Sequence, residues 1–130
     1  MNSNHKVIIN TPAKDRPRSS ELSAAFILAE YFKCDIIFLR PVSLKSPDFK
    51  IKDATWELKS PTGKSKNTIA NNFKYARKQS KNIIFDLRRC KLNERNAIIR
   101  IKKVVKSRRK KNRRVLVISK DGKVLDILEG

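Results

Sequence analysis

Residues 46–59 decide the fold, and they read S-P-D-F-K-I-K-D-A-T-W-E-L-K. Apolar residues alternate with polar ones in both halves of this stretch, at Phe49, Ile51, Trp56 and Leu58. Successive side chains of a β-strand point to opposite faces of the sheet, so this period of two predicts two strands. A tight turn at Asp53-Ala54 would join them as a hairpin with one apolar face and one polar face.

The predicted register of the hairpin follows from that turn. With Lys52 facing Thr55, the further pairs are Ile51 with Trp56, Lys50 with Glu57, Phe49 with Leu58 and Asp48 with Lys59. The polar face then carries Asp48, Glu57 and Lys59. Directly opposed Cβ atoms in a sheet lie about 5 Å apart, and diagonal ones roughly 7–8 Å. The sequence therefore predicts a cluster of two carboxylates and one lysine.

This cluster suggests a chemistry. Two carboxylates at that spacing can hold a divalent cation such as Mg²⁺ or Mn²⁺, and a lysine beside them can orient or deprotonate a water. We therefore expect a metal-dependent site that cleaves phosphodiesters, in which Asp48 and Glu57 bind the ion and Lys59 acts on the water. The alternative is an ordinary cross-strand ion pair on a solvated face, and the chain would then bind nucleic acid without cleaving it.

The same stretch resembles the PD-(D/E)XK, or restriction-endonuclease-like, nuclease superfamily, with Pro47-Asp48 and Glu57-Leu58-Lys59 as its signature. The resemblance implies an α/β fold with a mixed sheet and an α-β-β-β-α-β core. We expect its helices at residues 21–33 and about 68–80, and its strands at 36–39, 48–52, 56–60 and 82–87.

Two further site residues come only from this resemblance. Many members carry a glutamate on the first helix, matched by Glu21 as a third metal ligand, and a glutamine on the crossover helix, matched by Gln79 as a catalytic residue. Each also has a purely structural explanation. An acid in the first turn of a helix stabilises the helix dipole, and a glutamine at the border of a buried face is often a satisfied polar residue.

A looser resemblance covers two later runs, W-E-L-K-S-P-T-G-K-S-K-N-T-I from Trp56 and A-R-K-Q-S-K-N-I-I-F-D-L from Ala76. They look like C-terminal toxin domains of contact-dependent inhibition and mobile-element systems, several of which cleave tRNA. This resemblance implies action in the cytoplasm after delivery in a longer toxin, and an acidic immunity protein as partner. Related toxins of the barnase/EndoU/colicin/RelE type need no metal, so a metal-independent ribonuclease stays open.

Composition narrows the choice of partner. The 130 residues include 32 Lys and Arg against 12 Asp and Glu, which gives a net charge of +20. Such a surface attracts polyanions, and we expect RNA or DNA rather than a membrane, because the sequence has no long apolar run. The only histidine is His5, which disfavours mechanisms that depend on paired histidines. We expect a polar arm at residues 1–20 and one nuclease-like domain at 21–130.

Much of the positive charge lies in residues 88–114, which hold 14 Lys and Arg and one acid, Glu94. Apolar residues recur there at helical spacing, at Ala97, Ile98, Ile101, Val104 and Val105, and predict an amphipathic helix with a basic outer face. We expect nucleic-acid contacts, mostly to phosphates. The residues predicted to make them are Lys64, Lys66, Arg77, Arg88, Arg89, Arg108, Arg109 and Lys110.

Both ends of the chain also carry strand signals. Residues 115–119 and 123–128 flank Asp121-Gly122, a two-residue turn signal, and predict a hairpin that extends the sheet. The short apolar run Val7-Ile8-Ile9 suggests an edge strand at residues 6–10. For the helices, we expect Ser19 or Ser20 to cap the first, and Asn67 or Thr68 to cap the second.

Overall fold

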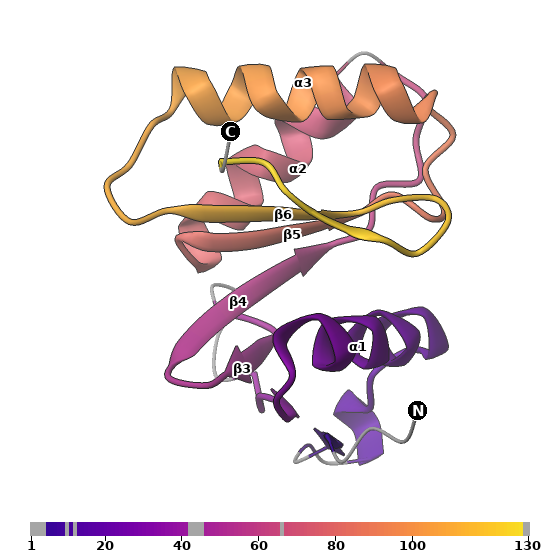
Figure 1. Cartoon of the computed structure of the whole chain (residues 1–130), viewed down its shortest axis with the longest axis vertical. Helices are drawn as coiled ribbons and strands as arrows, with labels where there is room; N and C mark the ends of the chain where they lie inside the picture. The colour runs from indigo at the N-terminus through magenta and orange to yellow at the C-terminus, as the bar shows by residue number, and fades with distance from the viewer. Residues whose placement is uncertain (1–4, 10, 12, 42–45, 66, 129–130) are drawn as a thin grey trace.

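The computed structural model describes residues 5–9, 11, 13–41, 46–65 and 67–128, which form one mixed seven-stranded sheet with three α-helices (Figure 1). The α/β fold class is therefore confirmed. The strands are β1 (Val7–Ile9), β2 (Ile36–Phe38), β3 (Phe49–Ile51), β4 (Ala54–Lys59), β5 (Asn82–Asp86), β6 (Arg114–Ile118) and β7 (Val124–Asp126). The helices are α1 (Ser19–Phe32), α2 (Thr68–Gln79) and α3 (Glu94–Ser107), and a 3₁₀ turn spans Ala13–Asp15.

The strands follow one another in the sheet in chain order, from β1 to β7. β2, β3 and β4 form an antiparallel meander, whereas β4, β5 and β6 run parallel. The parallel step from β4 to β5 is made by α2, and the step from β5 to β6 by α3. The predicted edge strand pairs parallel with β2, and the predicted C-terminal hairpin extends the sheet through β6 and β7, so both expectations are confirmed.

The helices cover opposite faces of the sheet. Alternate residues of the central strands divide between two cores: Ile84 and Leu116 pack in the core that holds α1, while Ile83 and Val115 pack in the core that holds α2 and α3. This is the period of two expected of strands buried on both faces. In Figure 1, α2 and α3 lie together on one side of β5 and β6. The same alternation decides which strand side chains lie under α2.

The helix starts differ in part from expectation. α1 begins at Ser19, and its first turn is closed by Glu21, whose Oε1 accepts a hydrogen bond from the Arg18 backbone N–H at 2.8 Å. The expected serine caps are therefore wrong, because both serines already lie inside the helix. α2 follows Asn67, as expected, although the Asn67 side chain makes no capping hydrogen bond. The predicted amphipathic helix is confirmed as α3, which buries Ala97, Ile101 and Val105.

The register of the β3–β4 hairpin differs from the expected one by two residues. The observed pairs are Phe49 with Trp56, Lys50 with Thr55 and Ile51 with Ala54. The turn therefore lies at Lys52-Asp53, and Lys52 adopts the left-handed conformation with φ +55°. A shift of two leaves every side chain on its predicted face, because the side-chain period of a strand is two. The alternation fixed the faces but not the turn.

The C-terminal hairpin has a three-residue connection instead of the expected two. Ser119 N–H donates to the Lys123 carbonyl at 2.8 Å, which leaves residues 120–122 in the turn. Gly122 has φ +84°, as in a type I turn followed by a left-handed residue.

Among the described residues, no helix combines the length and the apolar character needed to cross a bilayer.

Candidate functional site

The observed register places Asp48 directly opposite Glu57, since Phe49 pairs with Trp56. Asp48 is fixed at the entry to β3 by three hydrogen bonds. Its N–H donates to the Trp56 carbonyl at 3.0 Å, its carbonyl accepts from Leu39 N–H at 2.9 Å, and its Oδ2 accepts from Leu58 N–H at 2.8 Å. The carboxylate is therefore held against β4. The two acids lie closer together than the predicted register allowed, in which Asp48 faced Lys59.

Lys59 completes the predicted cluster. Its Nζ lies 3.1 Å from Oε2 of Glu57, two residues earlier on the same face of β4. The Glu57 residue is only 2 % exposed, and its Oε1 accepts no hydrogen bond from any residue that the structure describes. One oxygen of a buried carboxylate is thus paired and the other is unsatisfied. An unsatisfied buried polar atom commonly marks an ion or water position, or a catalytic group.

The electrostatics of the pair reflect this arrangement. Burial and, next, the adjacent Asp48 together raise the pKa of Glu57 from 4.5 to about 8, although Lys59 offsets part of the rise. Burial disfavours the ionised form of an acid, and a second carboxylate alongside acts in the same direction. The pKa of Glu57 therefore lies near neutral pH, where a side chain can both accept a proton from a substrate and return it.

The donor set suits a hard divalent cation. Asp48 and Glu57 supply carboxylate oxygens from facing strands, which are the ligands that Mg²⁺ and Mn²⁺ prefer. A divalent cation between them would satisfy the orphaned Oε1 of Glu57 and remove the repulsion between the two acids. The residues present therefore fit a cation bound by two carboxylates, with the remaining positions open to water and substrate.

Glu21 is not brought into this pair. No group of three or more Asp, Glu, His or Cys side chains close enough to bind a metal ion occurs in the part of the chain that the structure describes. Glu21 and Asp48 do line one small cavity of about 110 Å³, but Glu21 Oε1 is engaged at the start of α1. The structural explanation accounts for Glu21, and its role as a third metal ligand stays a prediction.

Gln79 is the last residue of α2 and is half-buried. The end of α2 is tied to the start of β4, because Ser80 Oγ and Asn82 Nδ2 both donate to the Thr55 carbonyl, at 3.0 and 3.1 Å. The helix that carries Gln79 is thus anchored two residues before Glu57. Its catalytic role stays a prediction.

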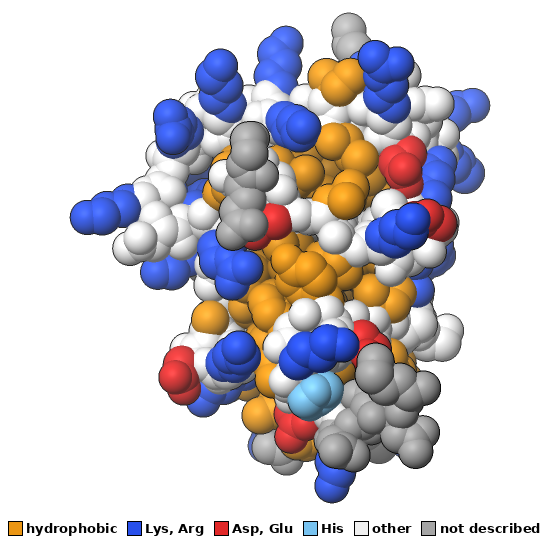
Figure 2. All heavy atoms as spheres, viewed as in Figure 1, with side chains coloured by type: hydrophobic (Ala, Val, Ile, Leu, Met, Phe, Trp, Pro, Cys, Tyr) orange, Lys and Arg blue, Asp and Glu red, His pale blue; other side chains and the backbone are white. Residues whose placement is uncertain are grey.

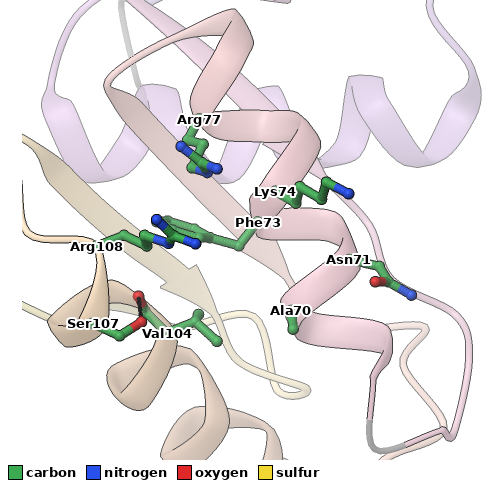
Figure 3. Close-up of a pocket in the computed structure, with 8 residues that line it drawn as sticks. All are labelled: Ala70, Asn71, Phe73, Lys74, Arg77, Val104, Ser107 and Arg108. Atoms are coloured by element: carbon green, nitrogen blue, oxygen red, sulfur yellow. Dashed lines mark hydrogen bonds between the residues drawn. The ribbon is translucent and has the colours of Figure 1, made fainter.

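The predicted phosphate-contacting residues fall in several places. Lys64 is exposed after β4, Lys66 lies outside the described residues, and Arg109 and Lys110 are exposed beyond α3. Arg77 and Arg108, far apart in the sequence, line one groove between α2 and α3 (Figure 3). In Figure 2, Lys and Arg side chains crowd the upper end of the molecule, where Figure 1 places α3.

Arg88 and Arg89 differ although they are neighbours. Arg88 binds Asp86 with two hydrogen bonds, from Nε at 2.9 Å and from Nη2 at 2.7 Å, and also donates to the Ser20 carbonyl. Asp86 is 1 % exposed, so this ion pair joins the end of β5 to the start of α1 inside the protein. Arg89 is exposed and lines a polar cavity of about 320 Å³ with Ser20, Ser60 and other residues. Of the two, Arg89 has the freer guanidinium for a substrate.

Sequence reasoning missed Arg113. This residue is 8 % exposed, and its guanidinium carbon lies 5.2 Å from the centre of the Phe73 ring. In the sequence, Arg113 is one of many basic residues between α3 and β6. The signal that could have found it is its spacing of two from the apolar Val115, which places both side chains on the α2–α3 face of the sheet.

Comparisons with known proteins agree with this fold. A chain of a solved structure, described as "CdiA-CT/CdiI toxin and immunity complex from Burkholderia pseudomallei", aligns with 93 % of this chain and 97 % of its own length, at a TM-score of 0.62 and 20 % identity. No curated protein matches the sequence. Residues 45–124 match the family described as "Contact-dependent growth inhibition CdiA C-terminal domain". Since this match spans more than half of the 130 residues, the chain belongs to the family of CdiA C-terminal domains of contact-dependent growth inhibition.

Proposed function

We propose that this toxin domain is a metal-dependent nuclease whose active site is formed by Asp48, Glu57 and Lys59. The observation that carries the proposal is the buried Glu57 carboxylate, faced by Asp48 and bound by Lys59 on one oxygen only. An acid pair by itself does not attract nucleic acid, because both carboxylates repel phosphate. A divalent cation between the acids would cancel their negative charge and could itself bind a phosphate oxygen.

Each residue has a distinct role in this mechanism. A bound Mg²⁺ or Mn²⁺ would polarise the scissile phosphate and supply a water of lowered pKa. Asp48 and Glu57 would hold the ion from facing strands, and the Asp48 carboxylate is oriented by the Leu58 N–H. Lys59 favours the ionised form of Glu57, would orient the attacking water and would offset negative charge that develops on the phosphate. Gln79, on the helix anchored beside β4, helps to orient the site.

RNA is the proposed substrate, with tRNA the best single choice, and DNA is the alternative polymer. Support comes from the net charge of +20 and from the family, since the looser resemblance noted above is to toxin domains that cleave tRNA. The proposed site of action is the cytoplasm of a target cell, reached as part of a longer toxin. The proposed partner is an acidic immunity protein, because the structural relative was solved as a toxin and immunity complex.

Cleavage assays test the proposal. Total tRNA and plasmid DNA are incubated with wild type, Glu57→Gln and Lys59→Met in Mg²⁺, Mn²⁺ or EDTA. Glu30→Gln is the matched control, because Glu30 is an exposed acid on α1 that, among the described residues, forms an ion pair with Lys33 alone. We expect metal-dependent cleavage by wild type and Glu30→Gln, and a loss of at least 100-fold in the two site variants, as for removal of a general catalytic or charge-stabilising group.

A metal-independent ribonuclease is the second candidate, and the pKa of Glu57 favours it. An acid that titrates near pH 8 beside a lysine can serve as general acid or base without an ion. Cleavage that persists in EDTA and is lost in Glu57→Gln would establish this candidate. Salt-sensitive binding without cleavage of either polymer would leave a nucleic-acid-binding module and reject both.

A further inference from the structure

A groove of about 360 Å³ runs between α2 and α3, on the side of the sheet that also carries Glu57. Figure 3 shows two arginine side chains that lie between the helices, Arg77 from α2 and Arg108 from the end of α3, and Lys74 of α2 also lines the groove. The other lining residues are Ala70, Asn71, Phe73, Val104 and Ser107. No acid is among the residues that line it.

Arg113 lies beside this groove, although it is not one of its walls. It precedes β6, and its spacing of two from Val115 directs it toward the core beneath α2 and α3. Its guanidinium packs on Phe73, which does line the groove. The residue is more than nine-tenths buried, and neither Nε nor Nη1 donates a hydrogen bond to any described residue.

The charged side chain that acts on Arg113 is another arginine, Arg77. Burial lowers the pKa of Arg113 below its usual range, and the nearby Arg77 lowers it further. No ion pair in the described part of the chain includes Arg113. Arg88 differs from Arg113 in this respect, because Asp86 accepts two hydrogen bonds from the Arg88 guanidinium. A buried cation with unpaired hydrogen-bond donors and a cationic neighbour is unfavourable unless an anion binds beside it.

We infer that the groove between α2 and α3 is a phosphate subsite, in which Arg113 and Arg77 bind a backbone phosphate of the nucleic acid away from the scissile bond. This inference rests on the proposed nuclease function. A guanidinium binds phosphate oxygens through its charge and through charge-assisted hydrogen bonds, so a phosphate in the groove can supply the anion that Arg113 lacks. Arg108 and Lys74 add positive charge at the mouth, and Ser107 and Asn71 add neutral polar groups.

The position of the groove suits this purpose. α2 contacts β4 on one side and α3 on the other, so it separates Glu57 from the groove. A helix with its side chains is roughly 10–12 Å across, and nucleotides rise about 3.4 Å each along a stacked strand. A strand crossing α2 would therefore place a phosphate about three nucleotides from the scissile one into the groove. The subsite would position the polymer without taking part in bond cleavage.

The test uses Arg113→Met, which removes the charge and keeps an apolar stem against Phe73. The matched control is Arg95→Met, since Arg95 is an exposed arginine in the first turn of α3 that does not line the groove. A second variant, Arg113→Lys, keeps the charge but loses the fork. Two readouts are taken for each: KM and kcat on an RNA oligonucleotide, and the rise in Tm with inorganic phosphate.

We expect Arg113→Met to raise KM roughly 10- to 100-fold, the loss expected of a charge-assisted hydrogen bond, with kcat within twofold of wild type. Arg113→Lys should fall between the two, and Arg95→Met should change KM by less than threefold. Inorganic phosphate should raise the Tm of wild type and of Arg95→Met, but not that of Arg113→Met. Without phosphate, Arg113→Met should be at least as stable as wild type, because an unpaired buried charge is gone.

Unchanged KM and an unchanged phosphate response in Arg113→Met would overturn the inference, even if Glu57→Gln abolishes cleavage and the nuclease function stands. Weaker binding of an acidic partner protein by Arg113→Met, with KM for RNA unchanged, would also overturn it and assign the groove to that partner. If wild type cleaves nothing, the nuclease function fails, and the Tm response to phosphate still decides whether the subsite exists.

Discussion

Asp48 and Glu57 face each other across β3 and β4, and Lys59 binds only one of the four carboxylate oxygens of the pair within ion-pair distance. The arrangement is electrostatically unfavourable as it stands, because burial and Asp48 together raise the pKa of Glu57 to about 8. An antiparallel hairpin could place a lysine opposite either acid at no such disadvantage. The pair is therefore better explained by what it binds than by what it contributes to stability.

The raised pKa of Glu57 makes stability depend on pH in a defined direction. The unfolded chain loses this proton near pH 4.5, whereas the folded protein keeps it until about pH 8. The free energy of unfolding therefore falls as the pH rises from about 4.5 to about 8. Glutamine cannot ionise, so the free energy of unfolding of Glu57→Gln relative to wild type should rise between pH 4.5 and pH 8. The rise is at most ~1.4 kcal/mol per pH unit, or several kcal/mol over the whole window.

Urea unfolding at pH 5 and pH 9 measures this difference. Glu30→Gln serves as the control, because its carboxylate is exposed on α1 and should give the same difference at both pH values. An equal difference between Glu57→Gln and wild type at the two pH values would show that the environment of Glu57 is not the one described here.

Binding of a divalent cation should be visible without any substrate. The cation competes with the proton for Glu57, so Mn²⁺ should raise Tm much more at pH 8.5 than at pH 5.5. At pH 8.5 the expected rise is several degrees, which is about the effect of a ligand at 100 times its Kd. Asp48→Asn and Glu57→Gln should each abolish the effect, and Glu21→Gln should leave most of it, since Glu21 is engaged at the start of α1. A rise in Tm that survives in Glu57→Gln would place the ion elsewhere.

The turn between β3 and β4 offers a test of the register that brings the acids together. Lys52 has φ +55°, which is unfavourable for a residue with a side chain, so Lys52→Gly should raise the free energy of unfolding by about 0.5–1 kcal/mol. Asp53→Gly should lower it by a similar amount, because glycine there adds only freedom to the unfolded chain. A turn at Asp53-Ala54 would not give this pattern, and stabilisation by Asp53→Gly instead would contradict the observed register.

The ion pair between Arg88 and Asp86 should prove structural. Arg88→Met leaves the buried Asp86 carboxylate unpaired and should lower the free energy of unfolding by roughly 3–5 kcal/mol. Arg89→Met, a neighbour with an exposed side chain, should change it by less than about 0.5 kcal/mol. Thermal or urea unfolding of the two variants separates them, and equal stabilities would contradict the assignment.

Local patterns predicted most of the architecture. The strand pair, the crossover helix α2, the basic helix α3 and the terminal hairpin follow from alternation or from helical spacing, and the structure confirms each of them. The face shared by Asp48, Glu57 and Lys59 was predictable for the same reason. A period of two survives any even shift of register, so the grouping was correct even though the predicted pairs were wrong.

The predictions that were wrong or missing concern the position of the β3–β4 turn and the contacts of individual arginines, which local sequence patterns do not determine. The turn could not be located, because Lys52 gives no sequence signal for a left-handed conformation, and the alternation is equally satisfied by a turn one residue later. The engagement of Arg88 by Asp86 and the burial of Arg113 depend on elements that meet only in the folded chain. A run of basic residues looks uniform in sequence, although in the structure its members are variously paired, exposed or buried.

The most direct test of the central claim is the cleavage of total tRNA by wild type and by Glu57→Gln, in Mn²⁺ and in EDTA, with Glu30→Gln alongside. If Asp48, Glu57 and Lys59 form a metal-dependent nuclease site, wild type and Glu30→Gln cut in Mn²⁺ and not in EDTA, and Glu57→Gln cuts at least 100-fold more slowly. Cleavage by Glu57→Gln at the wild-type rate would contradict the account.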